Sequence, residues 1–276
     1  MTSPAGSLRG DAFALDSVPE RYARLLAPAI FAPWARVLVE WVGLAAGETV
    51  LDVACGTGVV ARLAARRVGS TGRVVASDIS AAMLATAEAH KADRDAAAIE
   101  WVQAPATNLG VPDAEFGVVL CQQGLPFFTD RIGAVREMRR VVRADGIVGL
   151  AVWAAERPLF PFREYTEVLD THGVAAPFPG AYDGDSYVMS ETDVKDLLAG
   201  AGFSAIDVRT TELDVSWPDR DTAAQGILGT PFGPLVAALA DEPRRALMSD
   251  LAERLDPQDD RPLRRVTTSV IARATA

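Results

Sequence analysis

A short apolar run followed by a glycine-containing turn, residues 49–61, constrains the fold more than any other part of the chain. The run Thr-Val-Leu-Asp-Val-Ala is continuous and apolar apart from Thr49 and Asp52, which is typical of a strand buried on both faces of a parallel sheet. Gly56 and Gly58 lack a Cβ, so the backbone can turn sharply there and a ligand can approach it closely. The helix predicted from Val59 then offers unpaired N–H groups and the positive end of its dipole.

Two ligand classes are bound by turns of this kind. Gly56-x-Gly58-x-x-Ala61 fits the dinucleotide pattern, and Asp78 follows Gly58 by 20 residues, as that pattern requires. However, Asp52 would place a negative charge beside a pyrophosphate, which is unfavourable in a partly dry site. The carboxylate favours instead a ligand with an ammonium group. S-adenosylmethionine (SAM) has that group, together with a carboxylate for the N–H groups of the turn and a ribose for Asp78.

The segment 51–58 resembles motif I of the class I SAM-dependent methyltransferases, and Ser77-Asp78-Ile79-Ser80 resembles the acidic motif after their second strand. The resemblance implies that SAM is the cofactor, that both glycines line its methionine moiety, that Asp78 takes the ribose hydroxyls and that Ile79 packs on the adenine. Ala54 stands where the family often has a glycine. The complete set of expected SAM-binding residues is Tyr22, Phe31, Asp52, Ala54, Gly56, Thr57, Gly58, Asp78, Ile79, Met83, Ala106, Thr107, Cys121 and Gln122.

Strands that alternate with helices predict an α/β protein with a mostly parallel sheet. We expect strands over 49–54, 73–77, 99–103, 117–121 and 147–153, then 204–217 and 265–272, with helices over 59–67, 81–89 and 191–201 and a helix capped by Asp130. The resemblance places the last strand antiparallel between the strand 147–153 and the strand 204–217. The expected fold is a Rossmann-like, doubly wound, seven-stranded sheet with helices on both faces.

We interpret the chain as a single domain of five parts. Residues 1–12 form a flexible tail, and 13–45 form an N-terminal helical cap of two helices that meet at a bend, because Pro28 and Pro33 interrupt the pattern. Residues 46–153 form the SAM-binding core, 154–190 an aromatic lid, and 191–276 the rest of the sheet with a helical insertion. The aromatic residues of the cap, Tyr22 and Phe31, either close over SAM, as the resemblance implies, or pack in the core.

Two positions depart from the family pattern and affect the site. Pro105 stands where the family usually has an acidic residue for the adenine amino group, so adenine recognition falls to Ala106 or Thr107. Gly117 replaces an aspartate often found before the fourth strand.

The acceptor site is expected at the same edge of the sheet and in the lid. Expected substrate-binding residues are Gln123, Phe127, Trp153, Phe160 and Tyr165. Of the two histidines, His90 is expected at a helix end, whereas His172 is the candidate catalytic base or a structural residue.

Composition limits the partners. A net charge of −10 argues against nucleic acid and against an anionic membrane surface. Only two cysteines are present, with no metal-ligand spacing, no signal peptide and no apolar run of membrane-spanning length, so we expect a cytoplasmic protein without a metal.

The favoured function is SAM-dependent methyl transfer to a small, largely hydrophobic metabolite. The alternatives are a SAM-binding protein that catalyses another reaction, such as a cyclisation, and an NAD-binding protein. The sequence decides neither the acceptor nor the oligomeric state.

Overall fold

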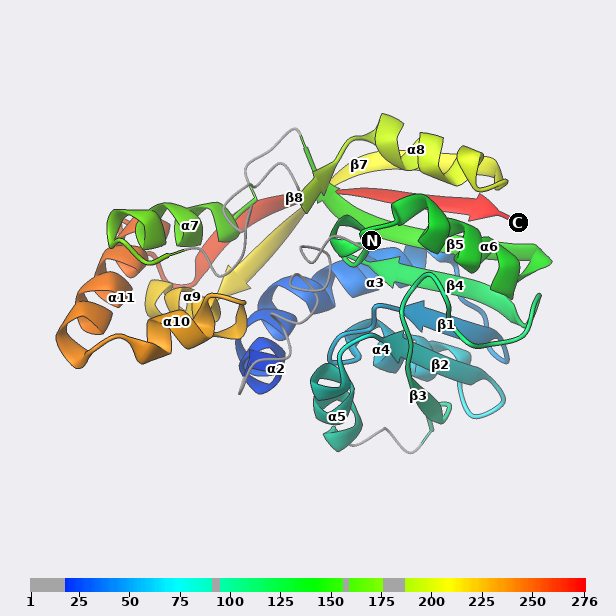
Figure 1. Ribbon diagram of the computed structural model, residues 1–276, viewed down its shortest axis with the longest axis horizontal. Helices are drawn as coiled ribbons and strands as arrows, with labels where there is room; N and C mark the ends of the chain where they lie inside the picture. Colours follow the sequence, from blue (N-terminus) through cyan, green and yellow to red (C-terminus); the bar gives the residue numbers. More distant parts are fainter. Residues whose placement is uncertain (1–17, 91–94, 156–158, 176–186) are drawn as a thin grey trace, which may run out of the picture.

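The computed structural model describes residues 18–90, 95–155, 159–175 and 187–276. Its centre is one twisted sheet in the order β3-β2-β1-β4-β5-β8-β7 (Figure 1). The parallel strands are β1 (Thr49–Val53), β2 (Arg73–Asp78), β3 (Ile99–Gln103), β4 (Phe116–Gln122) and β5 (Val142–Ala154). As expected, β8 (Leu263–Thr275) runs antiparallel between β5 and β7 (Ser204–Trp217). An eighth strand that was not predicted, the two-residue β6 (Val188–Met189), pairs with β5.

The order of the strands brings the candidate site residues to one edge. In the register of β1, Asp52 lies beside Ala76 of β2 and Leu120 of β4. Since these strands are parallel, their carboxyl ends meet, and the turn after β1 lies between the end of β2 and the end of β4. The edge therefore carries motif I, Asp78 and Gln122 together.

Helices cover both faces of the sheet, as expected. The helices are α4 (Val59–Val68), α5 (Ala81–Ala89), α6 (Arg131–Val141) and α8 (Glu191–Gly200), and α4 and α6 contribute to two separate hydrophobic cores. The Ser80 hydroxyl caps α5 by accepting from Met83 N at 3.2 Å, and Asp130 caps α6 by accepting from Gly133 N at 2.8 Å. The Asp130 cap was predicted, because a short polar side chain before an apolar helix satisfies its free N–H groups.

The N-terminal cap is not two helices meeting at a bend, as the prolines had indicated. It is one helical run of α2 (Val18–Arg21), the π-helix η2 (Tyr22–Phe31) and α3 (Ala32–Val42), with right-handed helical angles at both junctions. Pro28 lies inside the π-helical part and Pro33 in the first turn of α3. Trp34 and Leu38 of α3 are fully buried.

This run is also longer and more apolar than the sequence analysis allowed for. Val18–Val42 has a mean hydropathy of 1.4 over its most apolar window, enough by length and composition to cross a membrane. However, 56% of that window is buried inside the protein, as in the core helix of a soluble protein.

The helix of the expected lid that the structure describes, α7, packs against the later helical insertion, and together they form one unit, which we call the helical lobe. It consists of α7 (Phe162–Thr171), α9 (Arg220–Gln225), the 3₁₀-helix η5 (Gly226–Gly229), α10 (Gly233–Ala238) and α11 (Asp241–Leu255). Figure 1 shows it at one end of β7 and β8, beyond the parallel strands. The Tyr165 hydroxyl of α7 donates to the Ala223 carbonyl of α9 at 2.6 Å. The two segments were expected as separate parts of the chain.

Candidate functional site

The turn after β1 and the end of β2 are joined by the carboxylate of Asp78. One oxygen accepts from Gly56 N at 2.8 Å, and the other accepts from Ser80 N at 2.8 Å. Burial raises the pKa of Asp78, while the backbone N–H groups around it oppose that rise by stabilising the charged form. The carboxylate therefore fixes the geometry of the turn before any ligand arrives.

The turn requires glycine at its two glycine positions for different physical reasons. Gly56 has a φ of 53°, and a Cβ built there would meet no atom within 4 Å, so the turn faces open space on that side. Gly58 has a φ of 78°, and its Cβ would lie 2.5 Å from the indole ring of Trp101. Trp101 of β3 was not foreseen as a neighbour of motif I, because the two are far apart in the sequence. Ala54 also adopts a positive φ, of 56°, which is uncommon for a residue with a side chain.

Asp52 lies beneath this turn and is almost completely buried, with 1% of its surface exposed. Its Oδ2 atom has no hydrogen-bond partner among the described residues. Burial raises the pKa of Asp52 to about 8, with a further upward contribution from Asp78 and opposing contributions from the Ala61 amide and Arg62. A cation beside this oxygen would restore the charged carboxylate.

Unpaired polar atoms are concentrated at this edge. In the described part of the chain, ten side chains have a buried polar atom without a partner, and five of these lie at the ends of β1, β2 and β4: Asp52, Thr57, Ser77, Gln122 and Gln123. Buried polar groups are nearly always hydrogen-bonded in native proteins, so such a concentration indicates that a polar ligand supplies the missing partners.

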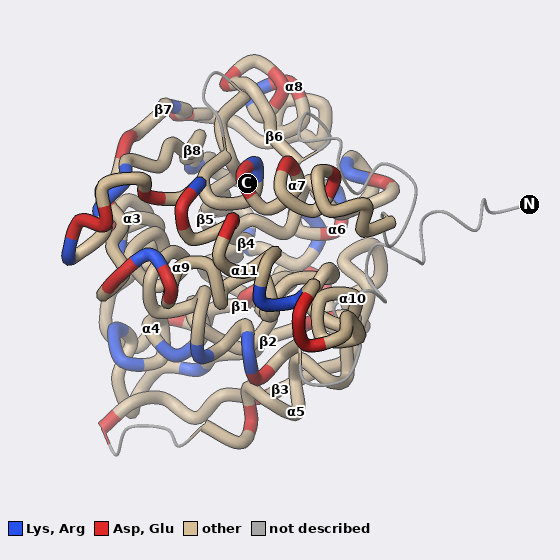
Figure 2. Tube along the Cα trace, turned by 90° about the vertical axis from the view of Figure 1, so that its left-hand side faces the viewer, with Lys and Arg blue, Asp and Glu red and all other residues tan. Residues whose placement is uncertain are grey.

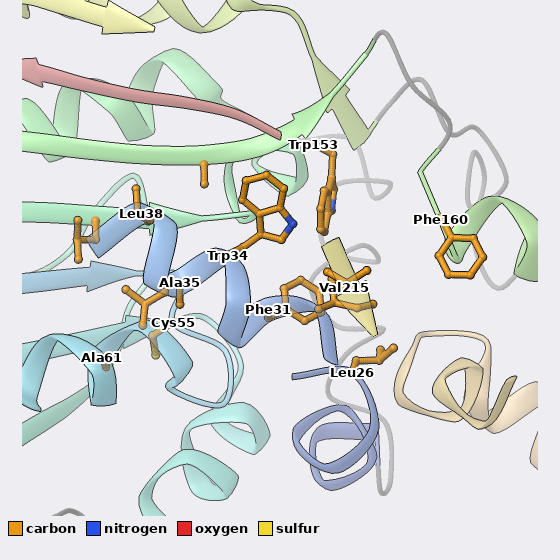
Figure 3. Close-up of a cluster of buried hydrophobic side chains, with 14 of the residues drawn as sticks. Leu26, Phe31, Trp34, Ala35, Leu38, Cys55, Ala61, Trp153, Phe160 and Val215 are labelled. Atoms are coloured by element: carbon orange, nitrogen blue, oxygen red, sulfur yellow. The ribbon is translucent and has the colours of Figure 1, made fainter. Parts of the chain in front are cut away.

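The aromatic residues of the cap cover the same edge. The Tyr22 and Phe31 rings lie 4.9 Å apart, and the Gln122 amide donates to the Phe31 carbonyl at 2.9 Å. Burial raises the pKa of Tyr22, as do the charges of Asp78 and Asp52, so the phenol lies within electrostatic reach of both carboxylates. In Figure 3, Phe31 lies beside Trp153 and Val215 within the hydrophobic cluster, so it serves both the edge and the core.

The expected adenine side of the site is more open. Ile79 follows Asp78 directly and exposes 56% of its surface, although large apolar residues are usually covered. Ala106 is half-buried and Thr107 is exposed beyond Pro105, and Met83 is buried. These residues fit SAM: a buried carboxylate for its ammonium group, open space in front of Gly56, and an exposed apolar side chain for the adenine.

The expected acceptor residues separate into two groups. Trp153, at the end of β5, has its ring 6.1 Å from Phe31 and 6.4 Å from Phe162, and Gln123 follows β4. Two others have partners in or near the helical lobe. The Phe160 ring packs on Trp217 at 5.5 Å, and Tyr165 is fully buried with its hydroxyl bonded to Ala223.

The remaining three expected residues, His172, Cys121 and Phe127, have different surroundings. His172 follows the last residue of α7, at the end away from Phe162, and its Nε2 lies 3.1 Å from the Asp250 carboxylate, in an exposed pair. Cys121, the neighbour of Gln122 in β4, is fully buried beside α6; burial raises the pKa of its thiol, as do the charges of Asp52 and Asp78, so the thiol lies within electrostatic reach of both carboxylates. The Phe127 ring lies 5.1 Å from that of Tyr187. His172 therefore has a structural partner, which was the alternative reading of this residue.

Comparisons with known proteins agree with this geometry. A family model described as a methyltransferase domain matches residues 51–150. The ubiquinone/menaquinone biosynthesis C-methyltransferase UbiE of Hahella chejuensis is 36% identical over 180 residues, which are 62% of this chain and 71% of the relative. The chloroplastic 2-phytyl-1,4-beta-naphthoquinone methyltransferase of Arabidopsis thaliana is 38% identical over 120 residues, which are 42% of this chain but only 46% of that relative.

A solved structure extends the likeness to the whole chain. Haemonchus contortus phosphoethanolamine N-methyltransferase 2, in complex with SAM, superposes with a TM-score of 0.60 at 18% identity and covers 100% of this chain and 60% of its own. At this low identity, the likeness shows the fold alone.

Proposed function

The chain belongs to the class I SAM-dependent methyltransferases, and from this membership we propose that it transfers the methyl group of SAM to a small, largely hydrophobic metabolite. The observation that carries the proposal is the buried Asp52 carboxylate, whose unpaired oxygen lies directly before the glycine turn that Asp78 fixes. A carboxylate at this position suits a ligand with an ammonium group and disfavours a pyrophosphate.

The residues of the site would hold and orient the two reactants. SAM supplies a methyl group that its sulfonium already activates. Asp52 pairs with the ammonium group, Asp78 accepts from the ribose hydroxyls, and Ile79 covers one face of the adenine. Tyr22 and Phe31 exclude water from the turn. Alignment of an acceptor with an activated methyl group supplies much of the rate in such a transfer, so the protein needs few chemical groups of its own.

The acceptor side supports a hydrophobic, aromatic metabolite. Beyond Gln122, the edge is bounded by Phe31 and Trp153, with Trp34 packed edge-on against Trp153 at 6.3 Å. Flat aromatic walls favour flat aromatic ligands. Both relatives are named for quinone-type compounds, which agrees with a hydrophobic, aromatic acceptor.

The size of the substrate and the location of the protein are two further features of the proposal. Acidic and basic residues lie interspersed over the face seen in Figure 2, and the net charge is −10, which supports a small-molecule substrate in place of nucleic acid. We also infer a single domain in the cytoplasm, from the continuous sheet and from a chain with only two cysteines, both buried and free.

Titration calorimetry with SAM, S-adenosylhomocysteine (SAH) and NAD tests the cofactor assignment. We expect both sulfur compounds to bind in the micromolar range and NAD not to bind. Methyl transfer is then assayed with radiolabelled SAM and aromatic acceptors. Tight binding of NAD, or no binding of SAM, would overturn the proposed function. If SAM binds and an acceptor is converted to a product without a new methyl group, that result would support the alternative of a different reaction, such as a cyclisation.

A further inference from the structure

The residue after the last position of β4, Gln123, has an unusual backbone and an unusual side chain. Its φ is 57°, in the left-handed region that residues with a Cβ rarely adopt outside tight turns. Its backbone N–H is held by the Ala151 carbonyl at 2.7 Å. The next residue, Gly124, packs directly against motif I, since a Cβ built on it would lie 2.6 Å from the Cβ of Ala54. Motif I therefore also holds this loop in place. Strained backbone that the surroundings fix in this way is often found at functional sites.

This backbone turns the side chain of Gln123 along the sheet. Its Nε2 donates to the hydroxyl of Ser269 at 3.1 Å, across β5 and onto β8. Ser269 lies directly opposite Trp153 in the β5–β8 pairing and is fully buried. The amide and the hydroxyl therefore form a polar pair next to the aromatic residue that bounds the acceptor side.

The pair is incomplete. Gln123 exposes only 5% of its surface, yet its Oε1 has no partner among the described residues. Ser269 accepts the bond from Gln123, so its own O–H hydrogen is left over, and no acceptor for it occurs in the part of the chain that the structure describes. A neighbouring pair in the same region shows the contrast: Trp34 Nε1 donates to the Thr267 hydroxyl at 2.9 Å, and that hydroxyl is 3.2 Å from the Leu213 carbonyl.

We propose that Gln123 and Ser269 together bind a hydroxyl group of the methyl acceptor. One free acceptor and one free donor side by side match a hydroxyl, because a hydroxyl both donates and accepts. It would donate to Gln123 Oε1 and accept from Ser269 Oγ. An ether or a carbonyl oxygen can only accept, so it would leave the Gln123 oxygen buried and unpaired. Sites built to bond a substrate hydroxyl reject analogues that lack it, for the same reason. The inference rests on the proposed function and adds to it a specificity for hydroxyl-bearing aromatic acceptors.

A glutamine amide does not titrate, so the pair anchors the acceptor and takes no proton from it. The preference for a hydroxyl is therefore expected to be the same between pH 6 and pH 8. This separates the pair from a general base, whose effect would follow its own titration.

The test measures binding to the SAH-saturated protein, with 1-naphthol as the hydroxyl probe and 1-methoxynaphthalene and 1,4-naphthoquinone as probes that only accept. We expect the wild-type protein to bind 1-naphthol at least tenfold more tightly than either other probe. Gln123→Met keeps the volume of the side chain but removes the amide, and Ser269→Ala removes the hydroxyl. Each is expected to reduce the preference to less than threefold while SAH affinity stays within twofold. Gln225→Met and Ser216→Ala, at exposed positions, are the matched controls and should keep the full preference.

Three results would overturn the inference: equal affinity of the wild-type protein for the three probes, no binding of any probe, or variants that keep the preference. The wild-type comparison needs no variant, so it decides even where a substitution prevents folding. If SAH binds and methyl transfer occurs without the preference, only this inference fails. If neither SAM nor SAH binds, the proposed function itself fails.

Discussion

Asp52 keeps its proton in the folded protein at pH values where the unfolded chain has lost it. Burial raises its pKa to about 8, whereas an exposed aspartate has a pKa of about 3.9. The folded state therefore binds more protons between about pH 4 and pH 8, and this residue's contribution to stability is greatest below pH 4 and is lost as pH rises through 8. An ammonium ligand favours the charged carboxylate, so it lowers this pKa when it binds.

We therefore predict that SAM binding at pH 6.5 releases nearly one proton, because Asp52 starts protonated and ends ionised. The amino group of SAM is already protonated at this pH, since an α-amino pKa lies at about 7.7–8.0. Calorimetry in buffers of different ionisation enthalpy measures the number of protons released. Asp52→Asn should release none, and Asp196→Asn, at an exposed position of α8, should behave like the wild type. A wild-type value near zero would show that the ligand's cation does not reach Asp52.

Asp78 is predicted to determine most of the affinity for SAM. Its two oxygens accept from Gly56 N and Ser80 N, each at 2.8 Å, and so fix the turn as well as facing the expected ribose. Hydrogen bonds to a charged group contribute about 1.5–3 kcal/mol each, so Asp78→Ala should raise the Kd for SAM by roughly 100-fold or more. Equilibrium binding of SAM measures this, and a urea unfolding curve shows whether the variant is folded. A folded Asp78→Ala protein with the wild-type Kd would place the ribose elsewhere.

The sequence was sufficient to predict the place of those site residues whose neighbours are close in the sequence or on the adjacent strand. Gly56 and Asp52 lie within five residues of each other, and Asp78 ends the next strand, so a motif and the parallel order of strands already bring them together. It was not sufficient for His172 and Tyr165, whose partners, Asp250 and Ala223, come from helices far along the chain. An aromatic segment indicates a packed unit, but which side chains face the ligand depends on what the unit packs against.

Helices and strands whose bounds depend on local sequence were predicted correctly, and those that depend on distant contacts were not. The bounds 99–103, 81–89 and 204–217 were predicted as observed, because apolar runs, caps and turn residues define them locally. The cap, residues 13–45, was predicted as two helices that meet at a bend, because proline normally interrupts a helix. The observed π-helix carries the chain through Pro28, and the run packs against η5 and β7 on the way, contacts that the sequence pattern does not reveal.

One close contact between elements joins the lobe to the cap. A Cβ at Gly229, in η5, would lie 2.8 Å from the backbone N and Cα of Tyr22, in η2. We predict that Gly229→Ala lowers the free energy of unfolding by about 1–3 kcal/mol, as is usual for overpacking, and weakens SAH binding because Tyr22 moves. Urea unfolding and equilibrium binding measure the two effects.

Gly200→Ala is the matched control for this contact, because a Cβ at this end of α8 would meet only the Ile132 side chain at 3.5 Å. It should leave SAH binding unchanged, and alanine in place of glycine within a helix should not lower stability. If Gly229→Ala also left both quantities unchanged, the lobe would not press on the cap as the structure shows.

At the scale of the whole molecule, the parallel sheet and the helical lobe share their longest elements. β7 has 14 residues and β8 has 13, and they pair from Ser204 and Thr275 to Trp217 and Leu263, so each strand begins in one part and ends in the other. The cap adds a second connection, since η2 packs against both η5 and β7. The two parts are therefore expected to unfold together, in one cooperative transition.

This coupling predicts how a ligand bound at the edge of the sheet affects the far end of the lobe. SAH at 100 times its Kd should raise the free energy of global unfolding by about 2.7 kcal/mol, because it binds only the folded protein. Native-state hydrogen exchange measures the increase separately for amides of β1, beside the site, and for amides of α11, within the lobe. Both sets should become more protected by the same amount, because both exchange through the same global opening. Gly229→Ala disturbs the contact between lobe and cap but not the shared strands, so the two increases should remain equal in that variant. An increase confined to β1 would show that the lobe opens by itself, and the long strands would then not join the two parts energetically.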